Sequence, residues 1–294
     1  PEKVALILFH TGGGCRASNY IHLLRKALEK AGYGYVPVIS LSMTGLEKHP
    51  GFQLTIPLVR RMMYGVLYGD LLMTLVNQTK PYEVERGSAQ ALADKWTEQL
   101  AWEMTEGGKA NYRQVKANYR RILDDFAALP VKRSDKVLVG IVGEIYVKYS
   151  PLGNNNLEQF LVDEGAEVVI PGLLDFCLYC VYNNLLDHKF YGMQKKVQWA
   201  YRIAYRYLLG KERDMIEAIN THGRFAPPTL FTHTISLVQG TISMGVKMGE
   251  GWLLTAEMLE LADKGVKNIV CTQPFGCLPN HICGKGMMRP IKAR

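Results

Sequence analysis

Six cysteines fall into three short clusters along the 294-residue chain. Each cluster lies where a strand or a helix is expected to end, often beside glycine or proline. Thiolates are preferred ligands of iron–sulfur clusters and of zinc. The pattern predicts one metal centre at which distant parts of the chain meet, and it favours iron–sulfur. The residues are Cys15, Cys177, Cys180, Cys271, Cys277 and Cys283.

The first cluster is TGGGC, which ends at Cys15. Its glycines would let the backbone approach a bulky group closely, and the N–H groups of a following helix would favour a thiolate. The segment matches neither the dinucleotide-binding GxGxxG pattern nor the phosphate-binding loop. Cys15 is therefore a candidate metal ligand, with a buried structural thiol as the alternative.

The second cluster, DFCLYC, places Cys177 and Cys180 on one face of a helical turn. Redox dithiols, zinc sites and iron–sulfur clusters all use a CxxC spacing. The bulky Leu178 and Tyr179 between the thiols argue against a thioredoxin-type site. At least one metal ligand is expected here, and Cys180 is the preferred candidate.

The third cluster, CTQPFGCLPNHIC, spaces its cysteines six residues apart. Cys271 should end a strand, and the prolines and glycine after it should form a rigid loop that presents Cys277. Cys283 lies beyond that loop and is the weakest candidate of the three. His281 is a further possible ligand, although a hydrogen-bonding loop residue is the favoured interpretation.

Other candidate residues carry weaker signals. Glu144 ends a predicted strand and is a candidate catalytic carboxylate, with a solvated or helix-capping carboxylate as the alternative. Lys285 and Arg289 could hold a phosphate or an anionic partner, and His10 reads as a core histidine. Zinc competes with iron–sulfur, but structural zinc sites usually draw their ligands from two nearby knuckles rather than from a whole chain.

Composition places the chain among globular proteins with a true core. Hydrophobic residues make up 48% and charged residues 21% of it, and the formal net charge is +8. No apolar run is long enough for a membrane span, no signal-peptide layout is visible, and the basic residues are too dispersed to predict nucleic-acid binding. A cytoplasmic protein with reduced thiols is expected. The first and last residues suggest a segment of a longer polypeptide.

The pattern of apolar residues predicts an α/β protein with two Rossmann-like parallel-sheet units and a helical insertion. Residues 1–50 read as strand, helix and strand, and the strand VALILF should be buried on both faces. Residues 51–130 carry helical periodicity only and should cover a sheet. Residues 131–294 form the second unit, which ends in the cysteine loop.

Four segments resemble the 2-hydroxyacyl-CoA dehydratase family, in particular its D-component-like region that is fused to activase modules and is related to double-cubane cluster proteins. The segments are HTGGGCRASNY, VGEIYVKYSPLGNNNLE, PGLLDFCLYCVYN and CTQPFGCLPNHICGKGM.

The resemblance implies an anaerobic iron–sulfur protein that receives low-potential electrons from an activase-type ATPase. It maps the ligands of a 4Fe-4S cluster onto Cys15, Cys180, Cys271 and Cys277, whereas Cys177 and Cys283 would be added in an 8Fe-9S double cubane. An acyl-CoA or another small molecule would be the substrate, and a dimer is one expected assembly. No nucleotide-binding signature of the activase is visible in this sequence. A non-catalytic metal-cluster or zinc scaffold is the alternative function.

Overall fold

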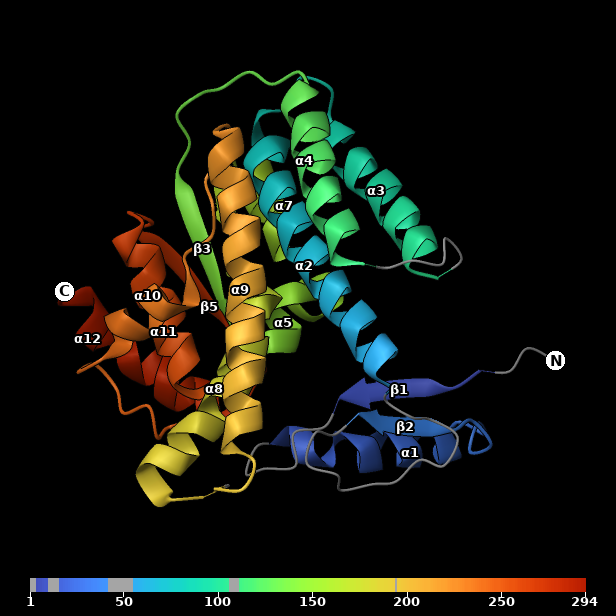
Figure 1. The fold of residues 1–294 in the computed structure, drawn as a ribbon, viewed down its shortest axis with the longest axis vertical. Helices are drawn as coiled ribbons and strands as arrows, with labels where there is room; N and C mark the ends of the chain where they lie inside the picture. Colours follow the sequence, from blue (N-terminus) through green and yellow to red (C-terminus); the bar gives the residue numbers. More distant parts are fainter. Residues whose placement is uncertain (1–3, 10–15, 42–54, 106–110, 194) are drawn as a thin grey trace.

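The computed structural model describes residues 4–9, 16–41, 55–105, 111–193 and 195–294 (Figure 1). It shows an α/β protein that is mostly helical and has two small parallel sheets among these residues. Two residues singled out in the sequence, His10 and Cys15, lie outside the described part of the chain. No helix of the described part is both long and apolar enough to cross a lipid bilayer.

The first sheet pairs β1 (Leu6–Phe9) with β2 (Val38–Leu41) in parallel. A 3₁₀ turn and helix α1 (Tyr20–Lys30) connect the two strands, as the sequence predicted. The prediction that β1 is buried on both faces is wrong, because Ile7 is 54% exposed. Among the described residues, this unit consists of two strands and one helix (Figure 1).

The prediction that residues 51–130 are helical is confirmed for most of the residues that the structure describes there. This helical insertion consists of α2 (Ile56–Thr79), α3 (Ser88–Thr105) and α4 (Tyr112–Ala128), with a short 3₁₀ turn after α2. Side-chain caps begin two of these helices: Thr55 accepts a hydrogen bond from the N–H of Leu58, and Asn111 accepts one from the N–H of Gln114. Helix α2 packs against the edge strand of the second sheet, so the insertion covers that sheet.

The second sheet has the strand order β4–β3–β5, and both pairings are parallel. Its strands are β3 (Leu138–Gly143), β4 (Glu167–Val169) and β5 (Asn268–Thr272). Three short helices, α5 (Ile145–Tyr149), α6 (Pro151–Asn154) and α7 (Leu157–Asp163), connect β3 to β4. The central position of β3 places its carboxyl end beside that of β5.

Long helices complete the fold. They are α8 (Leu173–Tyr191), α9 (Gln198–His222) and α11 (Gly251–Asp263), with the shorter α10 (Phe231–Val238) between α9 and α11. Gly192 separates α8 from α9. That residue has a φ of 67° and ends α8 with a left-handed cap.

The cysteine loop is also more helical than predicted. A π-helical turn (Asn280–Gly284), a 3₁₀ turn (Lys285–Met287) and α12 (Met288–Lys292) follow residues 273–279. Cys283 therefore lies beyond residues 273–279, as predicted, and within a helical turn.

One main hydrophobic core joins the insertion to the long helices. Its fully buried members come from α2, α3, α4, α8, α9, α10 and α11, and include Leu67, Tyr119, Leu178, Phe231 and Trp252. A smaller cluster lies between the second sheet and α11 and contains Val142, Leu254, Met258, Leu261 and Cys283. Helix α11 belongs to both clusters, which explains why nearly all of its side chains are buried.

Candidate metal centre at the strand ends

The carboxyl ends of β3 and β5 bring the third cysteine cluster to the edge of the sheet, where parallel α/β proteins place their sites. Cys271 pairs with Val142, and Thr272 pairs with Gly143. Gly143 has a φ of 143°, and a Cβ at this position would collide with the carbonyl oxygen of Thr272. Only glycine lets the two strand ends approach this closely, so Gly143 fixes the position of Cys271.

The half-buried thiol of Cys271 lies against the backbone of the following helical turn. A Cβ on Gly284 would lie 2.9 Å from the Cys271 sulfur, so a larger residue there would push against the thiol. Burial raises the pKa of Cys271 to about 11, and the charges of Glu257 and Cys277 contribute to the rise. The thiol therefore stays protonated at neutral pH unless a cation replaces its proton.

A buried amide connects Cys277 to a carboxylate on another element. The Nδ2 of Asn280 donates to the Cys277 sulfur at 3.2 Å and to the Oε2 of Glu250 at 3.3 Å. The other oxygen of Glu250, Oε1, accepts a hydrogen bond from the N–H of Ile145 at 2.8 Å. This network ties together the cysteine loop, the start of α11 and the start of α5.

The second cysteine pair lies in a helix, as predicted, but within the first half of α8 rather than where an element ends. Burial raises the pKa of Cys177 to about 11, and the charges of Asp70 and Asp175 add to this effect. Burial raises the pKa of Cys180 to about 12, with further contributions from Cys177 and Glu250. Both thiols are partly buried and neither is in a disulfide.

Cys283 is the most deeply buried of the described cysteines, at 1% exposure. Its carbonyl oxygen accepts a hydrogen bond from Oγ1 of Thr255 at 2.8 Å, and its side chain packs in the smaller hydrophobic cluster. Burial raises the pKa of Cys283 to about 11, and the negative charge of Glu250 adds to the rise. These contacts are those of a core side chain.

Glu250 lies near three of the five described cysteines. Its charge raises the pKa of Cys180 on α8 and of Cys271 and Cys283 in the third cysteine cluster. Burial raises the pKa of Glu250 itself, and it is 7% exposed. The described residues contain no group of three or more histidines, cysteines or acids arranged to hold a metal ion.

The weaker candidates have structural surroundings of their own. The Oε2 of Glu144 accepts a hydrogen bond from the N–H of Val147 at 2.9 Å and caps α5. This is the capping interpretation; a catalytic role for Glu144 stays a prediction. His281 is exposed at the second position of the π-helical turn, and Lys285 and Arg289 are exposed in the 3₁₀ turn and in α12 that follow it.

The sequence did not reveal the charged groups buried behind the cysteines. Lys148 of α5 donates to Oε1 of Glu257 on α11 at 2.8 Å, and both side chains are only 3% exposed. Among the described residues, Lys148 is the one cation with a buried side chain, whereas seven acids are buried: Asp70, Asp175, Asp187, Glu212, Glu250, Glu257 and Glu260. A lysine on a helix usually faces water, so the sequence did not indicate that Lys148 is buried.

Asp70 fixes the helix that carries Cys177 and Cys180. Its Oδ1 and Oδ2 accept hydrogen bonds from the N–H groups of Leu173 and Leu174, each at 2.8 Å. The residue before α8 is Gly172, which has no side chain to cap the helix. A carboxylate from α2 therefore accepts hydrogen bonds from the first N–H groups of α8. Its negative charge also lies at the positive end of the helix dipole, which is a favourable position.

Asp70→Ala is expected to lower the free energy of unfolding by about 2 kcal/mol, because two buried N–H groups lose their acceptors while one buried charge is removed. Urea unfolding followed by circular dichroism measures the change. Asp94→Ala is the matched control, since Asp94 is exposed on α3 and accepts a hydrogen bond only from Gln90 of its own helix. Equal stabilities of the two variants would refute the capping role.

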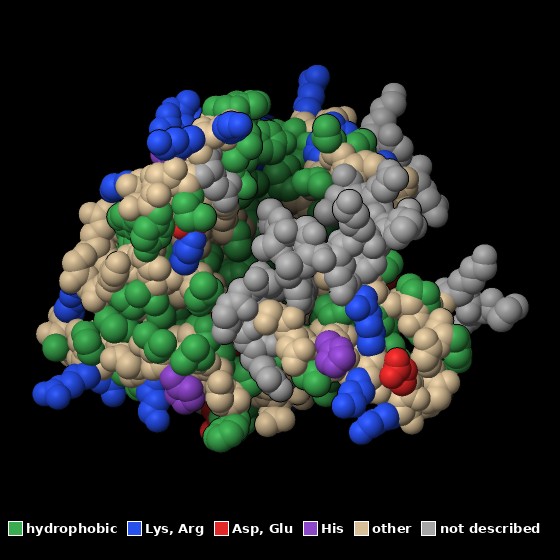
Figure 2. All heavy atoms as spheres, turned by 90° about the horizontal axis from the view of Figure 1, so that it is seen from below, with side chains coloured by type: hydrophobic (Ala, Val, Ile, Leu, Met, Phe, Trp, Pro, Cys, Tyr) green, Lys and Arg blue, Asp and Glu red, His purple; other side chains and the backbone are tan. Residues whose placement is uncertain are grey.

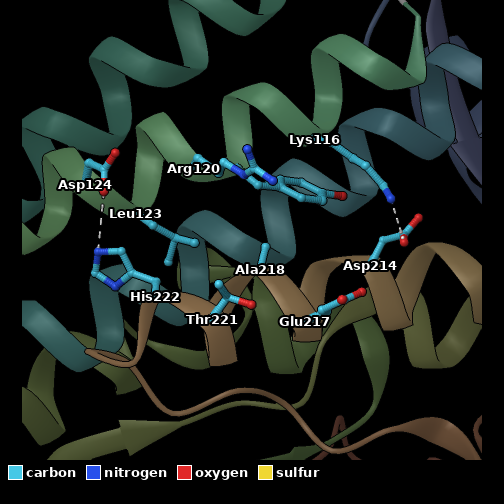
Figure 3. A pocket seen from close by; sticks show the side chains of 10 residues that line it. Lys116, Arg120, Leu123, Asp124, Asp214, Glu217, Ala218, Thr221 and His222 are labelled. Atoms are coloured by element: carbon cyan, nitrogen blue, oxygen red, sulfur yellow. Dashed lines mark ion pairs between the residues drawn. The ribbon is translucent and has the colours of Figure 1, made fainter.

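A separate groove of about 300 Å³ lies between α4 and α9 (Figure 3). Lys116 pairs with Asp214 at 2.8 Å near one end, and protonated His222 can pair with Asp124 at 3.6 Å near the other. The small side chain of Ala218 lies between the two pairs (Figure 3). Neither helix carries a cysteine, so the groove is distinct from the strand-end site.

Comparisons with known proteins give no relative. No family model matches the chain, and no curated protein or solved structure matches it. The function therefore has to be argued from the residues at the strand ends.

Proposed function

We propose that this protein is the iron–sulfur component of an ATP-dependent low-potential system, either a reductase or a dehydratase of the 2-hydroxyacyl-CoA type. The two parallel sheets would be the cores of Rossmann-like units. The observation that carries the proposal is the position of the third cysteine cluster at the carboxyl ends of β3 and β5, where the Asn280 amide joins the Cys277 sulfur to the buried Glu250. Helix α8 and the cysteine loop, two segments far apart in sequence, would supply soft ligands at this edge of the sheet.

The chemistry of the described thiols fits a metal cluster. None of them is in a disulfide, and all are partly or fully buried. Burial raises the pKa of Cys177, Cys180, Cys271 and Cys283, so ionising these thiols without a cation would be strongly unfavourable. A cluster supplies that cation and makes thiolates stable in a buried place. Because the described residues do not group three ligands, Cys15 is proposed to complete the set.

A single 4Fe-4S cluster would be held by Cys15, Cys180, Cys271 and Cys277. An 8Fe-9S double cubane would use Cys177 and Cys283 as well. When bound, the cluster would supply one-electron chemistry toward an acyl-CoA or another small molecule, with an activase-type ATPase as the electron donor.

The protein's own contribution would be positioning and electrostatics. The Asn280 amide donates to the Cys277 sulfur, and such hydrogen bonds tune the reduction potential of a cluster. Glu250 holds that amide in place through its Oε2.

A non-catalytic metal-cluster or zinc scaffold is the second candidate. The engagement of Glu144 as the cap of α5 favours it, because the carboxylate singled out for acid–base chemistry is already hydrogen-bonded to backbone. A scaffold of this kind would hold a metal to stabilise a larger assembly and would need no free acid or base.

Iron and acid-labile sulfide counts after anaerobic purification test the proposal. About four irons per chain would indicate one cubane and about eight a double cubane. Cys277→Ala is expected to abolish incorporation in either case, whereas Cys283→Ala should reduce it only if a double cubane forms. Circular dichroism of each variant separates loss of ligand from loss of fold. Colourless protein with stoichiometric zinc would overturn the cluster and support the scaffold.

A further inference from the structure

The outward face of α9 is unusually apolar over its first turns. Trp199, Ile203 and Tyr207 follow one another at every fourth position and are 66%, 59% and 45% exposed. The outer face of a surface helix is normally polar, so three large apolar side chains in one row are an informative exception. A contiguous apolar surface of this kind usually marks an interaction site.

The turn between α8 and α9 extends this row. Phe190, Tyr191, Met193 and Val197 are each at least 44% exposed. Together with the row on α9 they form a set of exposed apolar side chains, which we call the hairpin face: Phe190, Tyr191, Met193, Val197, Trp199, Ile203 and Tyr207. Figure 2 views the end of the molecule at which this turn lies and shows hydrophobic side chains spread over the surface, with lysines and arginines along its edges.

The charges of the same segment have one sign. Residues 188–207 include five lysines and arginines and no aspartate or glutamate. Arg202 and Arg206 are exposed on α9 beside the apolar row. Seven positions along an α-helix return to within about 20° of the same direction, so Arg206 projects nearly in line with Trp199. The arginines thus share the outward face with the apolar side chains.

The presence of arginines and apolar side chains on the same face indicates which kind of partner can bind there. A second copy of the chain docked face to face would bring like charges together, which opposes binding. A membrane-surface helix separates its cations from its apolar side, whereas here a lipid surface that took up Trp199 would have to take up Arg206 too. A protein helix with an apolar row flanked by carboxylates satisfies both sets of side chains.

The hairpin face also continues toward the cysteine loop. Asp187 at the end of α8 forms an ion pair with Lys247, and Pro279 of the cysteine loop lies against Gly249. Between them, Met248 is 52% exposed, and Phe275 of the cysteine loop is fully exposed. A partner on the hairpin face would therefore lie close to the strand-end site.

We infer that the hairpin face binds an amphipathic helix of an acidic partner protein. The apolar row of that helix packs on Trp199, Ile203 and Tyr207, and its flanking carboxylates pair with Arg202 and Arg206. The inference does not depend on a metal centre, because every residue that carries it lies outside the cysteine clusters.

The probe is a fluorescein-labelled peptide of about three heptads, with leucines in one row and glutamates beside it. Its counterpart carries lysine in place of each glutamate. Fluorescence anisotropy with the full chain is expected to show binding of the acidic peptide only, and the affinity should fall as salt is raised. Ile203→Asp and the double variant Arg202→Glu/Arg206→Glu should each weaken binding about tenfold or more.

Charge exchange separates specific docking from damage to the fold. The Arg202→Glu/Arg206→Glu variant should lose the acidic peptide and gain the lysine peptide. The control is Arg113→Glu/Arg120→Glu on the exposed side of α4, which should leave binding unchanged. Three results would overturn the inference: equal binding of both peptides, sedimentation with phosphatidylglycerol vesicles without peptide binding, or a dimer that the charge-reversal variant dissociates.

Discussion

Lys148→Met is expected to lower the free energy of unfolding by about 3–5 kcal/mol, which is the usual result of removing one partner of a buried ion pair. Methionine can fill the space of the lysine stem, so the effect is chiefly electrostatic. The variant leaves Glu257 without its cation while the charges of Glu260 and Glu250 remain near it. Urea unfolding at neutral pH measures the loss.

Two further variants show whether charge is the cause. In Lys148→Met/Glu257→Gln the unpaired carboxylate is gone, so this double variant should be more stable than Lys148→Met alone. The matched control is Lys116→Met, which breaks the Lys116–Asp214 pair of the same 2.8 Å length with a lysine side chain that is 52% exposed. That change should be within about 1 kcal/mol of the unaltered protein. A loss in Lys148→Met no larger than in this control would contradict the prediction.

Glu212→Gln is expected to raise the free energy of unfolding at pH 8, although most substitutions of a buried residue lower it. Glu212 is 2% exposed, and its Oε1 accepts a hydrogen bond from the N–H of Phe231 at 2.8 Å. Its Oε2 has no N–H or O–H partner among the described residues, and the Asp175 carboxyl lies beside it. A glutamine keeps the first hydrogen bond and can donate to Asp175 without a buried charge.

The pH dependence has a definite sign. Burial raises the pKa of Glu212 from 4.5 to about 8, so between these values the folded protein binds a proton that the unfolded chain has released. This contribution to stability is complete below pH 4.5 and is lost as the pH rises through about 8. The unfolding free energy should therefore fall toward pH 8 with a slope of up to about 1.4 kcal/mol per pH unit from this group.

Unfolding in urea from about pH 5 to pH 8 compares this slope with that of Glu212→Gln, in which it should be markedly smaller. Glu217→Gln makes the same change at an exposed position of α9 and should keep the slope of the unaltered protein. Parallel stability profiles for all three proteins would show that the Glu212 carboxyl does not hold its proton in the folded state.

Apolar periodicity predicted most of the elements, because it reports directly which face of a helix or strand is buried. The helices between residues 51 and 130 and the strand, helix and strand of residues 1–50 were predicted in this way. The predicted burial of β1 on both faces was wrong, because the pattern of apolar residues does not show how many layers cover a sheet.

The cysteines could be singled out from the sequence, but the groups around them could not. Glu257 and Glu260 read as outward positions of an amphipathic helix, yet α11 lies between two cores and has no outward side there. Glu250 and Asn280 are ordinary polar residues at a helix start and in a loop. Their roles depend on contacts between segments, which a local pattern does not contain.

The sharing of one core between distant helices also governs how the chain folds during synthesis. Phe126 of α4 and Trp252 of α11 belong to the same core, so α2 to α4 leave the ribosome well before their partner. At ordinary rates of translation this interval is on the order of ten seconds. During that time the apolar faces of these helices are exposed and can aggregate. Binding of chaperones to the growing chain is therefore expected to determine the yield of folded protein.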